Sequence, residues 1–274
     1  DLRIGFDLGW GGILEKIRRR RDDPPKTAEE GFYEGHEAVV LGIQAWIRKH
    51  AMRAWEMARS EGHPQLRANL LDMAEMNERL IHDPPGSLRE ACQWISWVAM
   101  VTRMFNGAGG IGQLDELLQP FYERDVALGL LDDETAIFHL ACMFLIDTQY
   151  YQIGGPGPDG KDRTSRISHL ILDALHRVKI PSNVTVRVWE GLDPDLFRKS
   201  VGYLFEDRNG SPRFMGEKGM TEGFMRNGYP IELARDRVTC GCHWAAIPGR
   251  EYTLNDIVKI NFAAVFDAAL REMA

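Results

Sequence analysis

Hydrophobic positions recur every three or four residues through most of the first 150 residues. This spacing places them on one face of an α-helix. Proline and glycine clusters such as Pro24-Pro25 and Pro84-Pro85-Gly86 interrupt the pattern and separate one helix from the next. The pattern predicts helices over residues 8–20, 35–61, 65–81, 88–105, 114–128 and 133–150.

Two of these helices carry more detailed signals. Ser87 precedes the helix over 88–105 and Glu90 follows three residues later, which is the arrangement of a capping box. That helix is apolar almost all round, and this predicts burial inside a larger body. The helix over 35–61 is amphipathic, and one stripe of it is expected to face its neighbours: Val39, Ile43, Trp46, Ile47, His50, Ala54 and Met57.

The pattern changes after residue 150. Residues 154–160 (GGPGPDG) predict a loop that no regular element could contain. Residues 184–188 alternate as a short β-branched strand, residues 213–215 are extended, and residues 237–242 predict another strand. Helices are expected over 163–178, 194–206, 219–228 and 254–273. Strands alternating with helices indicate parallel strands with helical crossovers, so the expected fold class is α/β.

Composition narrows the functional classes. Hydrophobic residues make up 44% and charged residues 27%, which is typical of a globular protein and excludes a fibre or a disordered chain. No apolar run approaches the 18 or so residues of a membrane span, and no leader-like segment is visible. A net charge of −7 argues against nucleic-acid binding. Four cysteines without a leader indicate free thiols. We therefore expect a cytoplasmic protein that binds neither nucleic acid nor membrane.

The densest chemistry lies in Cys240-Gly241-Cys242-His243, at the end of a predicted strand. Catalytic groups are presented at that end of strands in parallel α/β folds. Three interpretations are open. The cysteines could be small core residues. Together with His243 they could bind a metal, although a structural zinc needs a fourth ligand. One cysteine could instead be reactive, as a thiolate beside a basic partner or as a thiyl radical in a sealed site.

Five segments, in order along nearly the whole chain, carry a resemblance to a known family. They are Pro84-Pro85 with Glu90-Ala91 and Gln93; Asp115 with Pro120-Phe121-Tyr122 and Asp125; Gly154-Gly155 with Asp159-Gly160-Lys161-Asp162, Ser168 and Leu172-Asp173-Ala174; Pro181 with Val186-Arg187-Val188; and Ala234-Arg235-Asp236 with Gly241-Cys242, Pro248-Gly249-Arg250 and Asn255-Asp256. Together they resemble the glycyl radical enzymes, the pyruvate formate-lyase-like superfamily.

The resemblance implies a ten-stranded α/β barrel. Residues 1–274 would form a single segment of it, helical over 1–150 and α/β with a cysteine finger loop over 151–274. The matching catalytic residue is Cys242, whose thiyl radical would abstract hydrogen from a small organic substrate. The glycyl radical motif is absent from these 274 residues. The radical would therefore lie on a segment not present here, without which this segment would be inactive, and a radical SAM activating enzyme would install it.

The resemblance also implies further partners. They are the remaining segments of the same enzyme, the activase, and other copies in a homo-oligomer.

Departures from the family pattern refine this expectation. Trp244 stands where the dehydratases carry a glutamate base, and an indole cannot transfer protons. Asn106-Gly107 is followed by Ala108-Gly109 instead of the His-Ser pair that binds diols. Asp256 matches a family carboxylate. The resemblance thus favours a lyase that breaks a C–C or C–heteroatom bond without that base. The site would be more apolar than a diol site, with Asp256, Trp244, His243 and Gly109 as substrate-binding candidates.

Other interpretations stay open. A radical enzyme that adds a hydrocarbon or aromatic compound to fumarate, like the X-succinate synthases, also lacks the glutamate. It needs an arginine, where this chain has Ile257, and Arg250 is the nearest substitute. A non-enzymatic helical scaffold would use the tryptophan-rich helix over 88–105 to bind a partner. Asp256 could be a first-turn helix acid, and Trp244 could serve packing. Asp115, Asp162 and Arg187 are expected to be structural.

Overall fold

The structure is a computed structural model. It describes residues 1–25, 29–104, 110–147, 149–241, 244–251 and 261–273. The first part of the chain is helical, with two short strands: α1 (Leu2–Asp22), α2 (Phe32–Ser60), α3 (Pro64–Leu80), α4 (Leu88–Arg103), β1 (Gly110–Gln113), α5 (Leu114–Ala127), α6 (Asp133–Ile146) and β2 (Tyr150–Ile153). The six helices expected here are confirmed. The two strands were not expected, and the helix predicted to reach residue 150 ends at Ile146.

The rest of the chain alternates helices and strands. Its elements are α7 (Arg166–Val178), β3 (Asn183–Val188), α8 (Pro194–Asp207), β4 (Arg213–Gly216), α9 (Glu217–Arg226), α10 (Ile231–Asp236), β5 (Val238–Cys240), β6 (Trp244–Ala246) and α11 (Phe262–Met273). The helices expected over 163–178, 194–206 and 219–228 and the strands expected at 184–188 and 213–215 are confirmed within a few residues.

Four parallel strands form one sheet among the described residues, in the order β1-β2-β3-β4. Each step from one strand to the next runs through helices, so the α/β expectation is confirmed. Since β1 precedes residue 150, the sheet begins in the part of the chain expected to be helical. The strand expected over 237–242 becomes β5, which pairs antiparallel with β6 in a hairpin instead of extending the parallel sheet.

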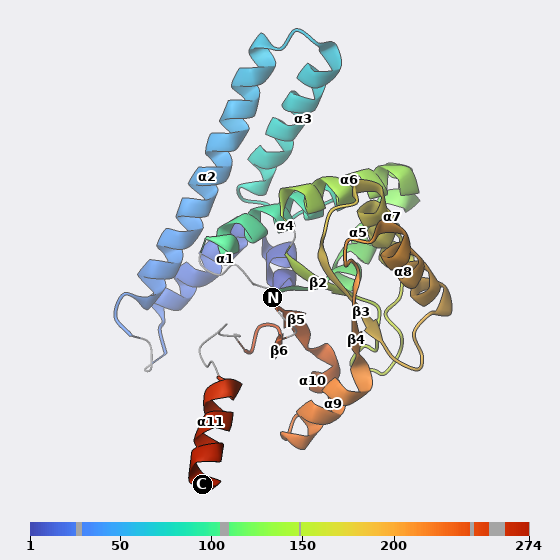
Figure 1. The fold of residues 1–274 in the computed structure, drawn as a ribbon. Coiled ribbons are helices and arrows are strands. Elements are labelled where there is room, and N and C mark those ends of the chain that lie inside the picture. Colours follow the sequence, from blue (N-terminus) through green and yellow to red (C-terminus); the bar gives the residue numbers. More distant parts are fainter. Residues whose placement is uncertain (26–28, 105–109, 148, 242–243, 252–260, 274) are drawn as a thin grey trace.

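The core lies where α4, α6 and α7 pack near the parallel sheet (Figure 1). Ile95, Leu140, Ile171 and Val184 are buried there. Both tryptophans of α4 are also buried, which confirms the burial predicted for this helix. At its N-terminus the Ser87 hydroxyl accepts a hydrogen bond from the Glu90 N–H at 3.2 Å. The Glu90 carboxylate turns to the N–H of Gly86 instead, so the predicted capping box is only half formed.

The helices α2 and α3 form a long hairpin that extends away from the rest of the molecule (Figure 1). Of the stripe expected to be buried on α2, Ile43 and Ile47 are buried, but Val39 and Met57 are 54% and 44% exposed. The buried face is made instead by these residues: Val40, Ile43, Gln44, Ile47, Ala51 and Ala58. The prediction of the stripe was therefore partly wrong. Val40, Ile43 and Ile47 of α2 and Leu80 of α3 belong to the main core, and farther along α2 the buried residues are the small Ala51 and Ala58.

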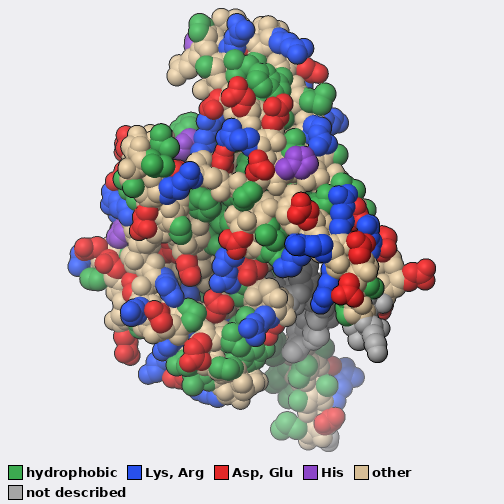
Figure 2. Space-filling view, turned by 180° about the vertical axis from the view of Figure 1, so that it is seen from behind, with side chains coloured by type: hydrophobic (Ala, Val, Ile, Leu, Met, Phe, Trp, Pro, Cys, Tyr) green, Lys and Arg blue, Asp and Glu red, His purple; other side chains and the backbone are tan. Residues whose placement is uncertain are grey.

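Acidic and basic side chains are interspersed over the face shown in Figure 2. No helix among the described residues combines the length and the apolar character needed to cross a membrane.

Candidate active site

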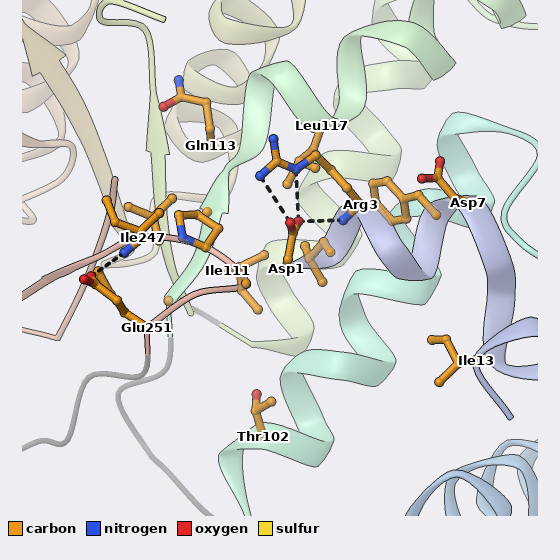
Figure 3. Close-up of a pocket in the computed structure, with 18 of the residues that line it drawn as sticks. Asp1, Arg3, Asp7, Ile13, Thr102, Ile111, Gln113, Leu117, Ile247 and Glu251 are labelled. Carbon is orange, nitrogen blue, oxygen red and sulfur yellow. Dashed lines mark hydrogen bonds and ion pairs between the residues drawn. The ribbon is translucent and has the colours of Figure 1, made fainter. Parts of the chain in front are cut away.

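A cavity of about 1170 Å³ lies between α1, α2, β1, the start of α5 and the β5–β6 hairpin (Figure 3). Most of its wall is apolar, with Phe6, Val40, Ile111 and Phe121 among the lining residues. Arg3 and Glu251 belong to the few charged groups on the wall. The Arg3 guanidinium pairs with Asp1 at 3.0 Å, and the Glu251 carboxylate accepts a hydrogen bond from the Ile247 N–H at 2.9 Å. These charges are therefore already partnered by neighbouring groups.

Most of the site residues predicted from the sequence lie outside the described residues: Cys242, His243, Asp256 and Gly109, together with Ile257. The cavity is nevertheless bordered by residues close in sequence to each of the segments that carry them. Gly110 directly follows Gly109, Val238 and Ala246 flank Cys242 and His243, and Glu251 precedes residues 252–260. Three separate parts of the chain with predicted site residues therefore lead to one cavity wall.

Trp244 is the one predicted substrate-binding residue that the structure describes. It lies half-buried at the start of β6 and pairs with Cys240. Gly241 between them has φ +54°, a left-handed conformation that glycine adopts readily. A Cβ atom at Gly241 would lie 2.3 Å from the Trp244 ring. The indole thus packs over the glycine of its own hairpin, which is the packing role that the sequence left open.

A buried group of charges lies behind the hairpin. The Glu217 carboxylate, at the start of α9, accepts hydrogen bonds from Arg187 through both of its oxygens at 2.9 Å, and from Arg237 at 2.9 Å. All three residues are at most 2% exposed. Burial lowers the pKa of the Arg237 guanidinium, while the Glu217 carboxylate opposes that shift. The structural role expected for Arg187 is confirmed.

Two aspartates also take the structural roles expected of them. Asp115 is fully buried and accepts hydrogen bonds from the Ser168 hydroxyl and the Gly154 N–H, both at 2.6 Å. It therefore ties the glycine-rich loop to α5. Burial raises the pKa of Asp115 to about 6, against the effect of its hydrogen bonds. Asp162 accepts hydrogen bonds from the Trp189 indole N–H and the Asp193 N–H.

Two buried glutamines were missed by sequence analysis. Gln113 lines the cavity, and its side-chain oxygen accepts hydrogen bonds from Arg187 at 3.0 Å and from Gln152 at 2.9 Å. Gln152 in turn contacts the backbone of β5. These contacts connect the cavity wall, the buried charges and the cysteine hairpin. Glutamines inside short strands form no recognisable motif, so the sequence carried no signal for them.

Of the other cysteines, Cys92 is buried, and burial raises the pKa of its thiol to about 12, while Cys142 is exposed. The described residues contain no group of three His, Cys, Asp or Glu side chains placed to hold a metal. The metal hypothesis involves Cys242 and His243, which lie outside the described residues, so it stays a prediction.

Comparison with known proteins identifies the family. The family described as pyruvate formate lyase-like matches residues 1–274. The isethionate sulfite-lyase of Desulfovibrio desulfuricans is 26% identical over 301 residues, which cover 96% of this chain but 35% of that protein. The chain thus spans about a third of the length of this relative.

Two solved structures share the fold. The glycerol-bound form of the B12-independent glycerol dehydratase from Clostridium butyricum superposes with a TM-score of 0.81 at 20% identity, over 88% of this chain and 34% of that one. A glycyl radical enzyme from Archaeoglobus fulgidus superposes with a TM-score of 0.78 at 23% identity, with the same coverage. The expected fold class, a portion of the α/β barrel of glycyl radical enzymes, is confirmed. By its matching family, its relatives and its fold, this chain belongs to the pyruvate formate lyase-like family.

Proposed function

We propose that this chain is the cysteine-bearing segment of a radical lyase, in which the Cys242 sulfur abstracts a hydrogen atom from a small organic substrate. The observation that carries the proposal is the convergence of three chain segments on one cavity. Gly110, Val238, Ala246 and Glu251 line its wall, and each stands close to a segment that carries a predicted site residue. A substrate in this cavity would lie beside the hairpin that bears Cys242.

Hydrogen-atom transfer at Cys242 is compatible with a mostly apolar cavity. A glycyl radical on another segment of the protein, installed by a radical SAM activating enzyme, would supply the oxidising equivalent. Cys242 gives up its thiol hydrogen atom, and its sulfur then takes one from the substrate, so an S–H bond forms as a C–H bond breaks. No net charge develops at the sulfur in either transfer. An apolar wall therefore imposes no electrostatic penalty on either transfer.

The reaction type follows from what surrounds the cysteine. Trp244 occupies the position of the glutamate base and packs on Gly241. A substrate radical that fragments on its own needs no such base, which favours lyase chemistry over dehydration. The relative from Desulfovibrio desulfuricans is by name a sulfite-lyase, whereas one from Clostridioides difficile is by name a dehydratase, so the names alone do not choose between the two. The mostly apolar wall favours a bulky or aromatic substrate, oriented by Asp256, with His243 and Gly109 as further contacts. Trp244, the other candidate, packs on Gly241 and does not line the cavity.

Fumarate addition is the less favoured alternative. It requires a cation free to bind a carboxylate at the cavity. Among the residues that the structure describes, Arg250 is exposed and does not line the cavity, and Arg3, which does, is paired with Asp1. A scaffold role is also less favoured, because a scaffold has no need of a large cavity next to its cysteine hairpin. The homo-oligomer and the cytoplasmic location stay predictions.

The test replaces one sulfur. In the full-length, activated protein, Cys242→Ser is expected to abolish turnover because a serine O–H bond is too strong to exchange hydrogen in this way. The glycyl radical signal in electron paramagnetic resonance should persist. Cys142→Ser is the matched control, since this exposed thiol lies on α6 and does not line the cavity. Turnover retained by Cys242→Ser would contradict the proposal.

A further inference from the structure

A row of polar side chains crosses one face of the parallel sheet. Strand register aligns four residues, one from each strand: Gln113, Gln152, Thr185 and Arg213. Residues in register on parallel strands point to the same face, and Arg187, two residues after Thr185, points there as well. Gln152 and Arg187 are 1% and 2% exposed. A row of buried polar groups is costly unless each finds a partner.

The partners are backbone groups of the segment that leads into the cysteine loop. The contacts are Arg187 Nη2 to the Arg235 carbonyl at 2.8 Å, Gln152 Nε2 to the Arg237 carbonyl at 2.9 Å, the Thr239 N–H to Gln152 Oε1 at 3.1 Å, and Arg213 Nη1 to the Gly241 carbonyl at 3.1 Å. They fall on every second residue from 235 to 241. One edge of the backbone over residues 235–241, which includes β5, is thus held by side chains of the sheet, while the other edge of β5 pairs with β6.

Gln152 acts on β5 as a neighbouring strand would. Its side-chain amide carries the same donor and acceptor as a peptide group, and it bonds a carbonyl and an N–H two residues apart on one edge. Its second amide hydrogen goes to Gln113 Oε1 at 2.9 Å. Both donors are therefore used, and the oxygen accepts from Thr239. An apolar side chain of the same size could supply none of these bonds.

Arg213 acts at the position nearest the cysteine. The Gly241 carbonyl belongs to the peptide bond that joins Gly241 to Cys242. The same guanidinium donates to the Thr185 hydroxyl at 3.2 Å and lies 5.1 Å from the centre of the Tyr150 ring. These contacts fix the planar group against the sheet, so the carbonyl that it binds is fixed as well.

We propose that Gln152 and Arg213 are positioning residues for Cys242. They hold the backbone of β5, up to the carbonyl before the cysteine, at a set distance from the sheet. The β5–β6 hairpin needs such support because two strands of three residues are not stable alone. Misplacing a reacting group by about 1 Å can cost about a hundredfold in rate. The inference rests on the proposed function only where it concerns turnover.

The experiment uses the full-length protein and two variants, Gln152→Met and Arg213→Met. Methionine keeps the length of the glutamine side chain but makes no hydrogen bond to β5. Gln149→Met is the matched control, because Gln149 is also fully buried and donates to the Ala99 carbonyl, away from the hairpin. Two quantities are measured: amide hydrogen exchange of residues 238–241, and turnover per glycyl radical, with the radical counted by electron paramagnetic resonance.

In Gln152→Met we expect exchange at Thr239 to accelerate about tenfold or more, since its acceptor is lost. Turnover per radical should fall by at least about tenfold, with radical content unchanged. Arg213→Met should lower turnover per radical in the same way, and because Arg213 is only half-buried, this variant keeps the test available if Gln152→Met does not fold. Gln149→Met should change neither quantity.

Unchanged exchange at Thr239 in Gln152→Met would overturn the role assigned to the glutamine. Unchanged turnover per radical in both variants would overturn their role in positioning the cysteine. The exchange result does not depend on whether Cys242 carries the radical. The turnover result does, and Cys242→Ser tests that role separately.

Discussion

At the scale of single residues, burial and hydrogen bonding act against each other. Asp115 is fully buried and accepts hydrogen bonds from Ser168, Gly154, Gln113 and Glu116. The loss of water still dominates, and the pKa of this carboxyl rises to about 6. Its charged form is therefore less stable in the folded protein than in the unfolded chain, where an aspartate has a pKa of about 4.

This shift sets a pH dependence. The stabilisation from protonated Asp115 is fully present below about pH 4, the unfolded value, and is lost as the pH rises through about 6. Between pH 4 and 7 the wild type should lose about 2 kcal/mol relative to Asp115→Asn, whose amide does not titrate. Urea unfolding of both proteins across this range measures the difference. A difference that stays constant with pH would contradict the shift.

At the scale of elements, the β5–β6 hairpin depends on one glycine. Gly241 has φ +54° and lies under the Trp244 ring. No side chain fits there unless the ring moves. A single residue also fixes the start of α4, because the Ser87 side chain caps that helix. Short elements are therefore determined by single positions.

Gly241→Ala should lower the melting temperature, because alanine costs about 1–2 kcal/mol in a left-handed conformation and its Cβ meets the indole. Gly241→Ala should cost less when it is made in the Trp244→Ala variant than when it is made in the wild type. In that variant the steric conflict with the ring is gone, and only the backbone strain remains. Thermal unfolding of both single variants and the double variant checks this. Strictly additive effects would show that the ring does not pack on Gly241.

At the scale of the whole molecule, the sheet and the hairpin are joined by buried charge. Glu217 of α9 links Arg187 of β3 to Arg237 before β5. Two guanidinium groups share one carboxylate, so this carboxylate holds together elements that are far apart in the sequence. The side-chain row that holds β5 lies beside the same group.

Glu217→Gln would leave two buried guanidinium groups without a counter-charge, and we expect a loss of about 3–5 kcal/mol in the free energy of unfolding. Glu222→Gln is the control on the same helix, since Glu222 forms an exposed pair with Arg226. Its effect should stay below about 1 kcal/mol. Equal effects in urea unfolding would contradict the role of Glu217.

The sequence by itself determined the parallel α/β class, the family, the glycine beside the cysteine and the helices of the described residues other than α10, which was not expected. These are local features: helical spacing, breaks at proline and glycine, and motifs read in order. It missed β1 and β2. The β1 sequence GIGQ has a single β-branched residue, and no proline or glycine separates the β2 sequence YYQI from the apolar end of α6.

Only the tertiary structure decided how the site is assembled. The row of Gln113, Gln152, Thr185 and Arg213 exists because four strands align in register, and register is a relation between segments that no single segment encodes. The cavity likewise forms where α1, β1 and the hairpin meet. Residue identities along the chain fixed which groups are available, and packing between distant elements fixed which of them touch.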